Sequence, residues 1–179
     1  AKTQFLEHFE SLLKSSAFDA EQLNQLPTAY DYIRLGHPLS SILEWAIAEL
    51  NQLPFDHVIS FSSKTAPILA VLRNNLFLGR KTQLLYTEDI SNFFGADLVR
   101  EIYGYQFEMK QVSAEEEIPD FDGSRVLISQ SSAIGDIQDD FNSDFVITTH
   151  GTLGSIIHIT KKEHASYISE IQHVRRRET

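Results

Sequence analysis

The sequence contains no cysteine among its 179 residues, and its basic residues are outnumbered by acidic ones. Without cysteine there can be no disulfide, no thiolate nucleophile and no cysteine-ligated zinc site. The 15 lysines and arginines against 25 acidic residues give a net charge of -10. This balance argues against a general nucleic-acid binder, because phosphate neutralisation requires clustered cations. No run is long enough to cross a bilayer, and no signal peptide is recognisable. We therefore expect an intracellular, cytoplasmic protein that binds neither nucleic acid nor membrane.

Seven histidines are present, but they are not arranged as metal ligands. No pair has the i, i+4 spacing with an acidic residue that a zinc-binding helix requires, so we predict no metal site. His150, at the end of an expected strand, is the best lone candidate for a general base, although a hydrogen-bonded structural role is favoured. A triad with Ser129 and Asp136 could be assembled on paper, but no Gly-x-Ser-x-Gly motif accompanies it.

Hydrophobic patterns of strand and helix type alternate along most of the chain. This alternation predicts an α/β protein of three αβα layers, with a mostly parallel sheet of about six strands and helices on both faces. We expect a single domain over residues 1–179, with an N-terminal helix and irregular arm at 1–38 and an α/β core at 39–179. The expected strands are 57–61, 82–87, 106–112, 125–129, 144–149 and 155–159, and the expected helices are 3–15, 39–50, 66–77, 91–103 and 161–174.

The helix expected at 39–50 has the cleanest amphipathic pattern in the chain. Its apolar residues recur on one side, and such a stripe ordinarily faces the core. Trp45 lies off the stripe and is expected to cover a second surface or an interface. Elsewhere, Ser91 is a plausible N-cap, and Gly79 and Gly104 are expected to end helices. The stripe comprises Leu39, Ile42, Leu43, Ala46, Ile47 and Leu50.

The segment 57–69 passes from a buried strand through a hydroxyl-rich turn into a helix. Helix N-termini carry unpaired N–H groups and a partial positive charge, which suits a bound anion. The hydroxyls of Ser62, Ser63 and Thr65 could equally serve as helix caps. Ligands of parallel α/β sheets lie beyond the carboxyl ends of the strands. That rule points here to the loops 62–65, 87–91, 129–133 and 148–152.

Two motifs in the first half of the chain are similar to those of a known enzyme group. Residues 32–50 read Tyr-x-Arg-x-x-x-Pro-x-x-x-x-x-Glu-x-x-Ile-Ala-x-Leu, and residues 61–66 read Phe-Ser-Ser-x-x-Ala. This pattern resembles the PLP-dependent enzymes of cysteine and methionine metabolism, which include cystathionine γ-synthase, cystathionine lyase and methionine γ-lyase. The resemblance implies a fold-type I, PLP-transferase-like large domain.

The resemblance also implies a phosphate site. In the family, a Tyr-x-Arg pair reaches the cofactor phosphate of a neighbouring subunit, and Tyr32 and Arg34 match that pair. The family's Ser-Ser-Gly-Met turn holds the same phosphate. Ser62 and Ser63 match its first half, whereas Lys64 and Thr65 replace the glycine and methionine. The candidate anion site therefore consists of Tyr32, Arg34, Ser62, Ser63, Lys64 and Thr65.

The positions that carry catalysis in the family differ here. Asp89 or Ile90 stands near the place of the ring that stacks on the cofactor. The strand end 128–130 (Ile-Ser-Gln) lacks the aspartate that pairs with the pyridine nitrogen. Residues 148–152 (Thr-Thr-His-Gly-Thr) lack the lysine that binds the cofactor, and Lys161 follows only after the next strand.

These differences favour a pseudoenzyme. We expect a non-catalytic homologue without a bound cofactor that acts as an oligomerising scaffold or partner-binding subunit, either as a homo-oligomer or with another protein. Two alternatives remain open. The chain could bind a phosphate-bearing small molecule through Arg34 and the 62–65 turn. It could also be an active PLP-dependent lyase or transferase in which Lys64 replaces the usual lysine.

Overall fold

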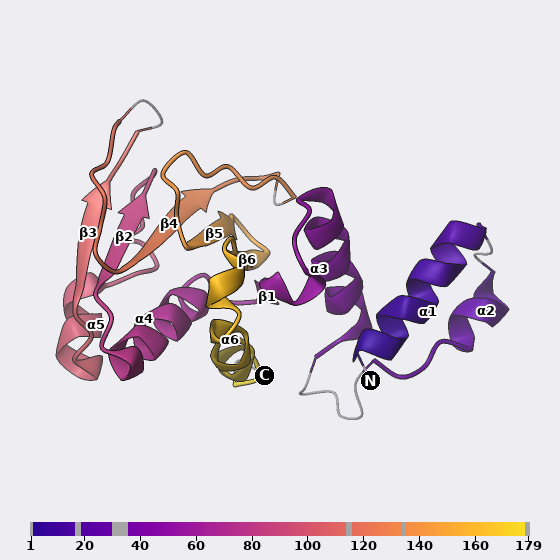
Figure 1. Cartoon of the computed structure of the whole chain (residues 1–179). Coiled ribbons are helices and arrows are strands. Elements are labelled where there is room, and N and C mark those ends of the chain that lie inside the picture. The colour runs from indigo at the N-terminus through magenta and orange to yellow at the C-terminus, as the bar shows by residue number, and fades with distance from the viewer. Residues whose placement is uncertain (1, 17–18, 30–35, 114–115, 134, 178–179) are drawn as a thin grey trace.

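The computed structural model describes residues 2–16, 19–29, 36–113, 116–133 and 135–177. It has the predicted α/β architecture, with a six-stranded sheet flanked by helices (Figure 1). The helices are α1 (Lys2–Ser15), α2 (Ala20–Asn24), α3 (Pro38–Leu50), α4 (Ala66–Leu78), α5 (Ala96–Tyr103) and α6 (Tyr167–Arg175), with short 3-10 helices η2 (Phe55–His57) and η3 (Lys162–His164). The strands are β1 (Val58–Phe61), β2 (Thr82–Tyr86), β3 (Phe107–Gln111), β4 (Ser124–Gln130), β5 (Phe145–His150) and β6 (Gly154–Ile159).

The sheet is mostly parallel, as predicted, with the strand order β1-β6-β5-β4-β2-β3. The pairs β2–β3, β2–β4 and β4–β5 are parallel, whereas β6 runs antiparallel to both β5 and β1. Strands β4, β5 and β6 are buried along most of their lengths, which is why they read as continuous apolar runs. Every strand except β6 points the same way, so the carboxyl ends of these strands reach one edge of the sheet.

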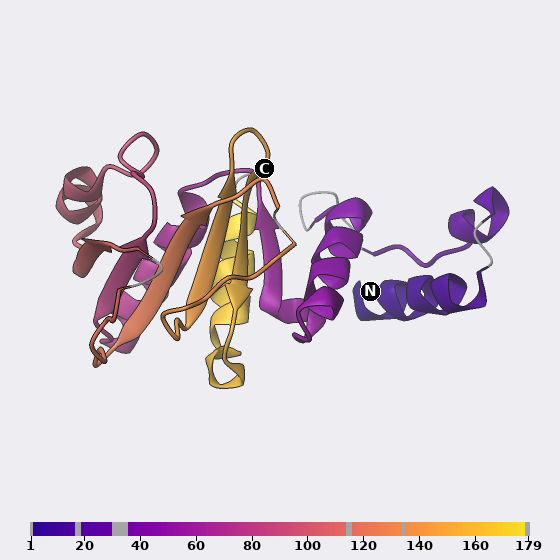
Figure 2. The same ribbon diagram turned by 90° about the horizontal axis from the view of Figure 1, so that it is seen from above.

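The two faces of the sheet are covered differently. The larger core lies on the face covered by α4, α5 and α6, and α4 and α6 lie side by side there (Figures 1 and 2). On the other face, α3 packs on β1 and β6 through Ile47 and Ala48. Irregular chain that includes Val112 and Phe141 covers β4 and β5 on that face. The second helical layer is therefore confined to one end of the sheet.

Helices α1 and α2 extend away from the sheet, and α3 lies between them and β1 (Figures 1 and 2). Phe5 and Leu6 of α1 are buried in a small cluster with Trp45 of α3. The rings of Phe9 and Trp45 meet edge to face, with centroids 5.8 Å apart. Of the two roles expected for Trp45, a second surface or an interface, the structure shows the first, a surface against α1.

The orientation of α3 is the largest departure from the sequence prediction. Leu39, Leu43 and Leu50 of the stripe are 69%, 40% and 76% exposed, whereas Glu44 is completely buried. The buried side of α3 consists of Ser41, Glu44, Ile47 and Ala48. The prediction of a helix was right, but all three leucines of the apolar stripe face outward.

Helix boundaries agree with the prediction at two glycines and disagree at a serine. Gly79 and Gly104 end α4 and α5 in the left-handed conformation, with φ of 64° and 67°. Ser91 is not an N-cap, because α5 begins only at Ala96. The Asp89 carboxylate accepts hydrogen bonds from the Ser91 N–H and hydroxyl, each at 2.9 Å. This local turn competes with helix formation at Ser91.

Candidate functional site

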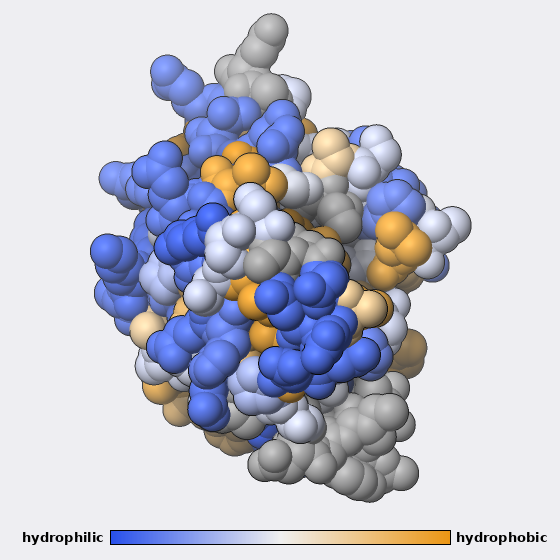
Figure 3. Space-filling model, turned by 90° about the vertical axis from the view of Figure 1, so that its right-hand side faces the viewer, coloured by the Kyte–Doolittle hydropathy of each residue, from blue (hydrophilic) through white to orange (hydrophobic). Residues whose placement is uncertain are grey.

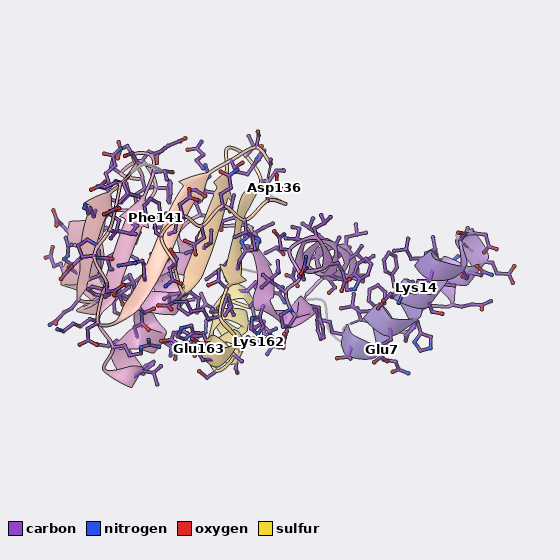
Figure 4. All side chains as sticks on the ribbon, turned by 45° about the horizontal axis from the view of Figure 1, so that its top comes forward. Glu7, Lys14, Asp136, Phe141, Lys162 and Glu163 are labelled. Atoms are coloured by element: carbon purple, nitrogen blue, oxygen red, sulfur yellow. The ribbon has the colours of Figure 1, made fainter. Side chains whose placement is uncertain are left out.

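The four loops predicted to surround a ligand do lie at one edge of the sheet. Strands β1, β2, β4 and β5 end at Phe61, Tyr86, Gln130 and His150, and the chain direction places all four ends at that edge. Asp136 lies at this edge, whereas Lys162 and Glu163 lie at the opposite one (Figure 4).

The 62–65 turn is organised by its own side chains. The Ser63 Oγ accepts hydrogen bonds from the N–H groups of Thr65 and Ala66, each at 3.1 Å, and so caps α4. The Thr65 hydroxyl donates to the Phe93 carbonyl at 2.7 Å. Pro67 follows in the first turn of α4 and supplies no N–H group. The start of α4 therefore has fewer amides available to an anion than a helix N-terminus ordinarily offers.

Lys64 reaches across this turn to the β5–β6 hairpin. Its Nζ donates to the Gly151 carbonyl at 3.1 Å and lies 5.8 Å from the centroid of the Phe93 ring. Within the described residues, no carboxylate forms an ion pair with Lys64. The ammonium therefore places a positive charge between the two turns, against an aromatic face.

Phe93 is the residue at this edge that sequence reasoning missed. The family resemblance puts Asp89 or Ile90 near the aromatic position after β2, but the chain continues for several residues before α5 begins. That longer excursion brings Phe93 against Lys64 and Thr65. The spacing of the family motif could not have indicated it.

The β5–β6 hairpin is short and tightly held. His150 pairs with Gly154, so only residues 151–153 form the turn. Gly154 has φ of +94°, and a Cβ there would lie 2.2 Å from the Phe61 carbonyl oxygen. The Ser155 hydroxyl donates to the Ser63 carbonyl at 2.6 Å. These contacts fix the hairpin against the 62–65 turn.

His150 has a structural role in that hairpin. Its Nδ1 accepts hydrogen bonds from the N–H groups of Thr152 and Leu153, each at 3.2 Å. A ring nitrogen that accepts is unprotonated, so the proton of the neutral ring lies on Nε2. Ser129 and Asp136 line a hollow of about 280 Å³ beyond β4, but His150 is not among the residues that line it. Among the described residues, no hydrogen bond joins His150 to Ser129 or Asp136, as a Ser129–His150–Asp136 triad would require.

Two members of the candidate anion site, Tyr32 and Arg34, lie outside the described residues. The other four, Ser62, Ser63, Lys64 and Thr65, occupy one turn.

Among the residues that the structure describes, no group of three or more histidine or acidic side chains is placed to hold a metal ion. Likewise, no helix in the described ranges combines the length and hydrophobicity needed to cross a membrane.

Comparison with solved structures finds the fold in enzymes of sulfur amino-acid metabolism. Cystathionine gamma synthase from Xanthomonas oryzae pv. oryzae, in complex with cystathionine, is similar with a TM-score of 0.52 and 13% identity, over 84% of this chain and 49% of that one. MetB from Corynebacterium glutamicum has a TM-score of 0.49 and 15% identity, over 87% of this chain and 51% of that one. Cystathionine gamma-lyase from Lactobacillus plantarum, complexed with L-serine, has a TM-score of 0.47 and 15% identity, over 90% of this chain and 51% of that one.

Only the first of these TM-scores exceeds 0.5, and at such identities the likeness shows the fold alone. The chain spans about half the length of each of the three structures. No protein-family model matches the sequence, and no curated protein matches it either.

The described residues at the carboxyl edge do not fit pyridoxal phosphate in the way that the sequence resemblance implies. The three-residue turn 151–153 contains no lysine. Strand β4 ends at Ser129 and Gln130, neither of which is a carboxylate that could pair with a pyridine nitrogen. Lys64 brings an amine to the hairpin turn, but from the opposite loop.

Proposed function

We propose that the chain is a non-catalytic homologue of the PLP-dependent sulfur amino-acid enzymes, and that it acts by forming an oligomer. The described carboxyl edge keeps the turn, the hairpin and a nearby aromatic ring, but it lacks the lysine and acid that the family's chemistry uses. A protein that has this fold but lacks these catalytic groups can still bind other subunits through its surface.

The orientation of α3 is the observation that carries this proposal. Leu39, Leu43 and Leu50 form an exposed apolar stripe on the helix. Single exposed leucines are ordinary on protein surfaces, but an aligned row on one helix face is typical of a contact surface. The inner side of the same helix buries the Glu44 carboxylate. A rotation of the helix that buried the leucines would therefore bring Glu44 to the surface.

A second copy of the chain is the partner that fits this stripe. The stripe carries no charge, whereas the chain as a whole has a net charge of -10, which disfavours close approach of two copies through most other surfaces. A row of leucines is self-complementary, and two-fold symmetric contacts use the same patch on both subunits. On the side of the molecule that carries α1, α2 and α3, other apolar surface is broken into patches between polar side chains (Figure 3).

Replacing stripe leucines by glutamate is expected to break the oligomer. We predict that Leu39→Glu and Leu50→Glu each weaken self-association at least tenfold, because each change removes buried apolar area and places two like charges at a symmetric contact. Sedimentation velocity over a range of concentrations measures the effect. Leu98→Glu on α5 is the matched control, since Leu98 is 59% exposed on a different helix.

Two results would count against this assembly. The unmodified chain could sediment as a monomer at every concentration, in which case α3 contacts another protein or a further segment of a longer chain. Alternatively, Leu98→Glu could weaken association as much as the stripe variants do, which would move the contact away from α3.

Lys64 supports a second candidate function, the binding of a phosphate-bearing small molecule. Its ammonium lies at the carboxyl edge of the sheet beside Phe93 and the hydroxyl-rich turn, without a carboxylate partner in the described part of the chain. Arg34 would join this site only if the chain before α3 approaches the same turn. Pyridoxal 5′-phosphate, which carries both a phosphate and an aldehyde, is a suitable probe for this turn.

A further inference from the structure

The opposite, amino-terminal edge of the sheet contains a cleft that lies away from the candidate site. It lies between the end of α4 and the starts of β2 and β3, at the lower left of Figure 1. Its volume is about 430 Å³, which falls within the range of small-molecule sites. The residues that matter for its chemistry are Arg80, Lys81, Phe107, Glu108 and Phe121.

Arg80 contributes a half-buried charge that the described residues do not neutralise. Its guanidinium donates three long hydrogen bonds, to the Tyr167 hydroxyl at 3.3 Å, to His164 Nδ1 at 3.4 Å and to the Gly123 carbonyl at 3.4 Å. None of these partners is anionic, and no described carboxylate lies within ion-pair distance of Arg80. Arginine remains ionised in proteins, and a partly buried charge without a counterion is unfavourable.

The carboxylate of Asp144 is already engaged on the far side of His164. It accepts from Lys161 Nζ at 2.8 Å, from the Arg125 N–H at 2.8 Å and from His164 Nε2 at 2.9 Å. Burial opposes its ionisation, but these hydrogen bonds outweigh that effect and lower the pKa of Asp144. Because Arg80 can only donate, His164 Nδ1 accepts from it and His164 Nε2–H donates to Asp144. His164 therefore lies between the Arg80 guanidinium and the Asp144 carboxylate.

Lys81 adds a second cation at the mouth of the cleft. Its side chain is exposed, and no described residue is bonded to its ammonium. Glu108 is the single acidic residue among those that line the cleft. Two cations and one carboxylate thus give this hollow a local charge opposite in sign to that of the whole chain.

The remainder of the cleft is lined by apolar residues and by a pair of polar side chains that are already hydrogen-bonded to each other. Phe107, Phe121 and Leu72 are among its lining residues. At its floor, the buried Asn75 Nδ2 donates to the Thr82 hydroxyl at 2.8 Å, so neither side chain requires a partner from a ligand. The lining of the cleft therefore combines cationic and apolar residues.

We propose that this cleft binds a small carboxylate with an aromatic body. The carboxylate would take the fork of Arg80 and the ammonium of Lys81, since guanidinium groups match the two oxygens of a carboxylate. The aromatic body would pack on Phe107 and Phe121. Nothing in the proposed assembly through α3 requires this site, so the two proposals stand or fall separately.

Titration with phenylacetate, followed by amide chemical shifts in a ¹⁵N–¹H spectrum of the full chain, tests the proposal. The largest shifts are expected in residues 75–82, 106–108 and 121. Phenylacetamide has the same shape without the charge, so it is expected to bind at least tenfold more weakly. Inorganic phosphate, which lacks the aromatic body, is expected to bind more weakly than phenylacetate as well.

Three variants locate the binding. Arg80→Gln is expected to weaken phenylacetate binding tenfold or more, because hydrogen bonds to charged groups are the strong ones. Lys81→Gln, which removes an exposed charge without a partner, is expected to weaken it about threefold and to fold normally. Lys162→Gln is the control, because Lys162 is an exposed lysine at the same edge that does not line the cleft (Figure 4).

The proposal is overturned if phenylacetate at millimolar concentration shifts no amide of the cleft, or if phenylacetamide binds equally well. It is also overturned if the largest shifts fall in the 62–65 turn. If Arg80→Gln does not fold, Lys81→Gln decides, and affinity equal to that of the unmodified chain contradicts the proposed site.

Discussion

Replacement of Glu44 by alanine is expected to lower the free energy of unfolding by about 3–5 kcal/mol, as is typical when one partner of a buried ion pair is removed. The Glu44 carboxylate is completely buried between two cations. Lys2 Nζ lies 2.7 Å from its Oε2, and an Arg175 guanidinium nitrogen lies 2.5 Å from its Oε1. Oε1 also accepts from the Ser60 N–H at 3.0 Å and the Ser60 hydroxyl at 2.9 Å.

The two cations are also shielded, and this is why the expected effect is large. The Lys2 and Arg175 side chains are only 15% and 11% exposed. Without Glu44 they would face each other as like charges with little solvent between them, and the Ser60 N–H would lose its acceptor. Lys2 belongs to α1 and Arg175 to α6, so this carboxylate ties both ends of the described chain to α3.

Urea unfolding followed by circular dichroism measures this effect. Glu49→Gln is the matched control, because Glu49 is an exposed carboxylate on the same helix, and it should change the free energy of unfolding by no more than about 0.5 kcal/mol. Glu44→Gln keeps an acceptor but removes the charge, so it should fall between the two. A change below about 1 kcal/mol for Glu44→Ala would show that the ion pairs do not form as described.

Acidification from about pH 6.5 to pH 4 is expected to cost the protein about 3 kcal/mol of stability through His158 alone. Burial lowers the pKa of His158 to about 4, and the hydrogen bond to the Val146 carbonyl opposes this only weakly. The His158 Nε2 is buried without a hydrogen-bond partner in the described structure. The unfolded chain takes up a proton below about pH 6.5, whereas the folded chain does so only near pH 4. Lower pH therefore favours the unfolded chain across that interval.

His158→Leu should flatten this pH dependence, because leucine is of similar size and does not titrate. The measurement is the free energy of unfolding at pH 7 and at pH 4.5 for the unmodified chain and for the variant. His173→Gln, which changes an exposed histidine, should leave the difference between the two pH values unchanged. An equal loss of stability on acidification in His158→Leu and the unmodified chain would assign the effect to other groups.

The sequence predicts the fold well because the fold depends on local patterns. The apolar runs of β4, β5 and β6 indicate buried strands wherever they occur, and Gly79 and Gly104 end their helices through a backbone conformation that glycine adopts at little cost. Alternation of such elements then restricts the arrangement to a mostly parallel sheet.

The features that the sequence does not predict depend on contacts between distant residues. Periodicity identifies α3, but which side faces inward is decided by Lys2, Ser60 and Arg175, which hold Glu44 from three separate elements. Phe93 reaches Lys64 only because the chain after β2 takes an irregular path before α5.

The position of Arg80, at the amino-terminal edge of the sheet, also depends on contacts between residues far apart in the sequence. Arg80 follows a helix-ending glycine and looks like an ordinary surface residue in the sequence. The structure directs it toward His164 and Tyr167, which lie more than eighty residues later. For the candidate anion site, the turn at 62–65 lies at the predicted edge, and the contribution of Tyr32 and Arg34 stays a prediction because they lie outside the described residues.

The measurement that most directly tests the non-catalytic assignment is an equimolar titration with pyridoxal 5′-phosphate. Visible absorption would be recorded before and after borohydride reduction, with the covalent adduct counted by mass spectrometry, for the unmodified chain, Lys64→Ala and Lys162→Ala. We predict no distinct protein-bound absorption band and the same low level of adduct in all three proteins. A stoichiometric, reducible band that persists in Lys162→Ala and disappears in Lys64→Ala would contradict this assignment and would make Lys64 the cofactor-binding lysine of an enzyme.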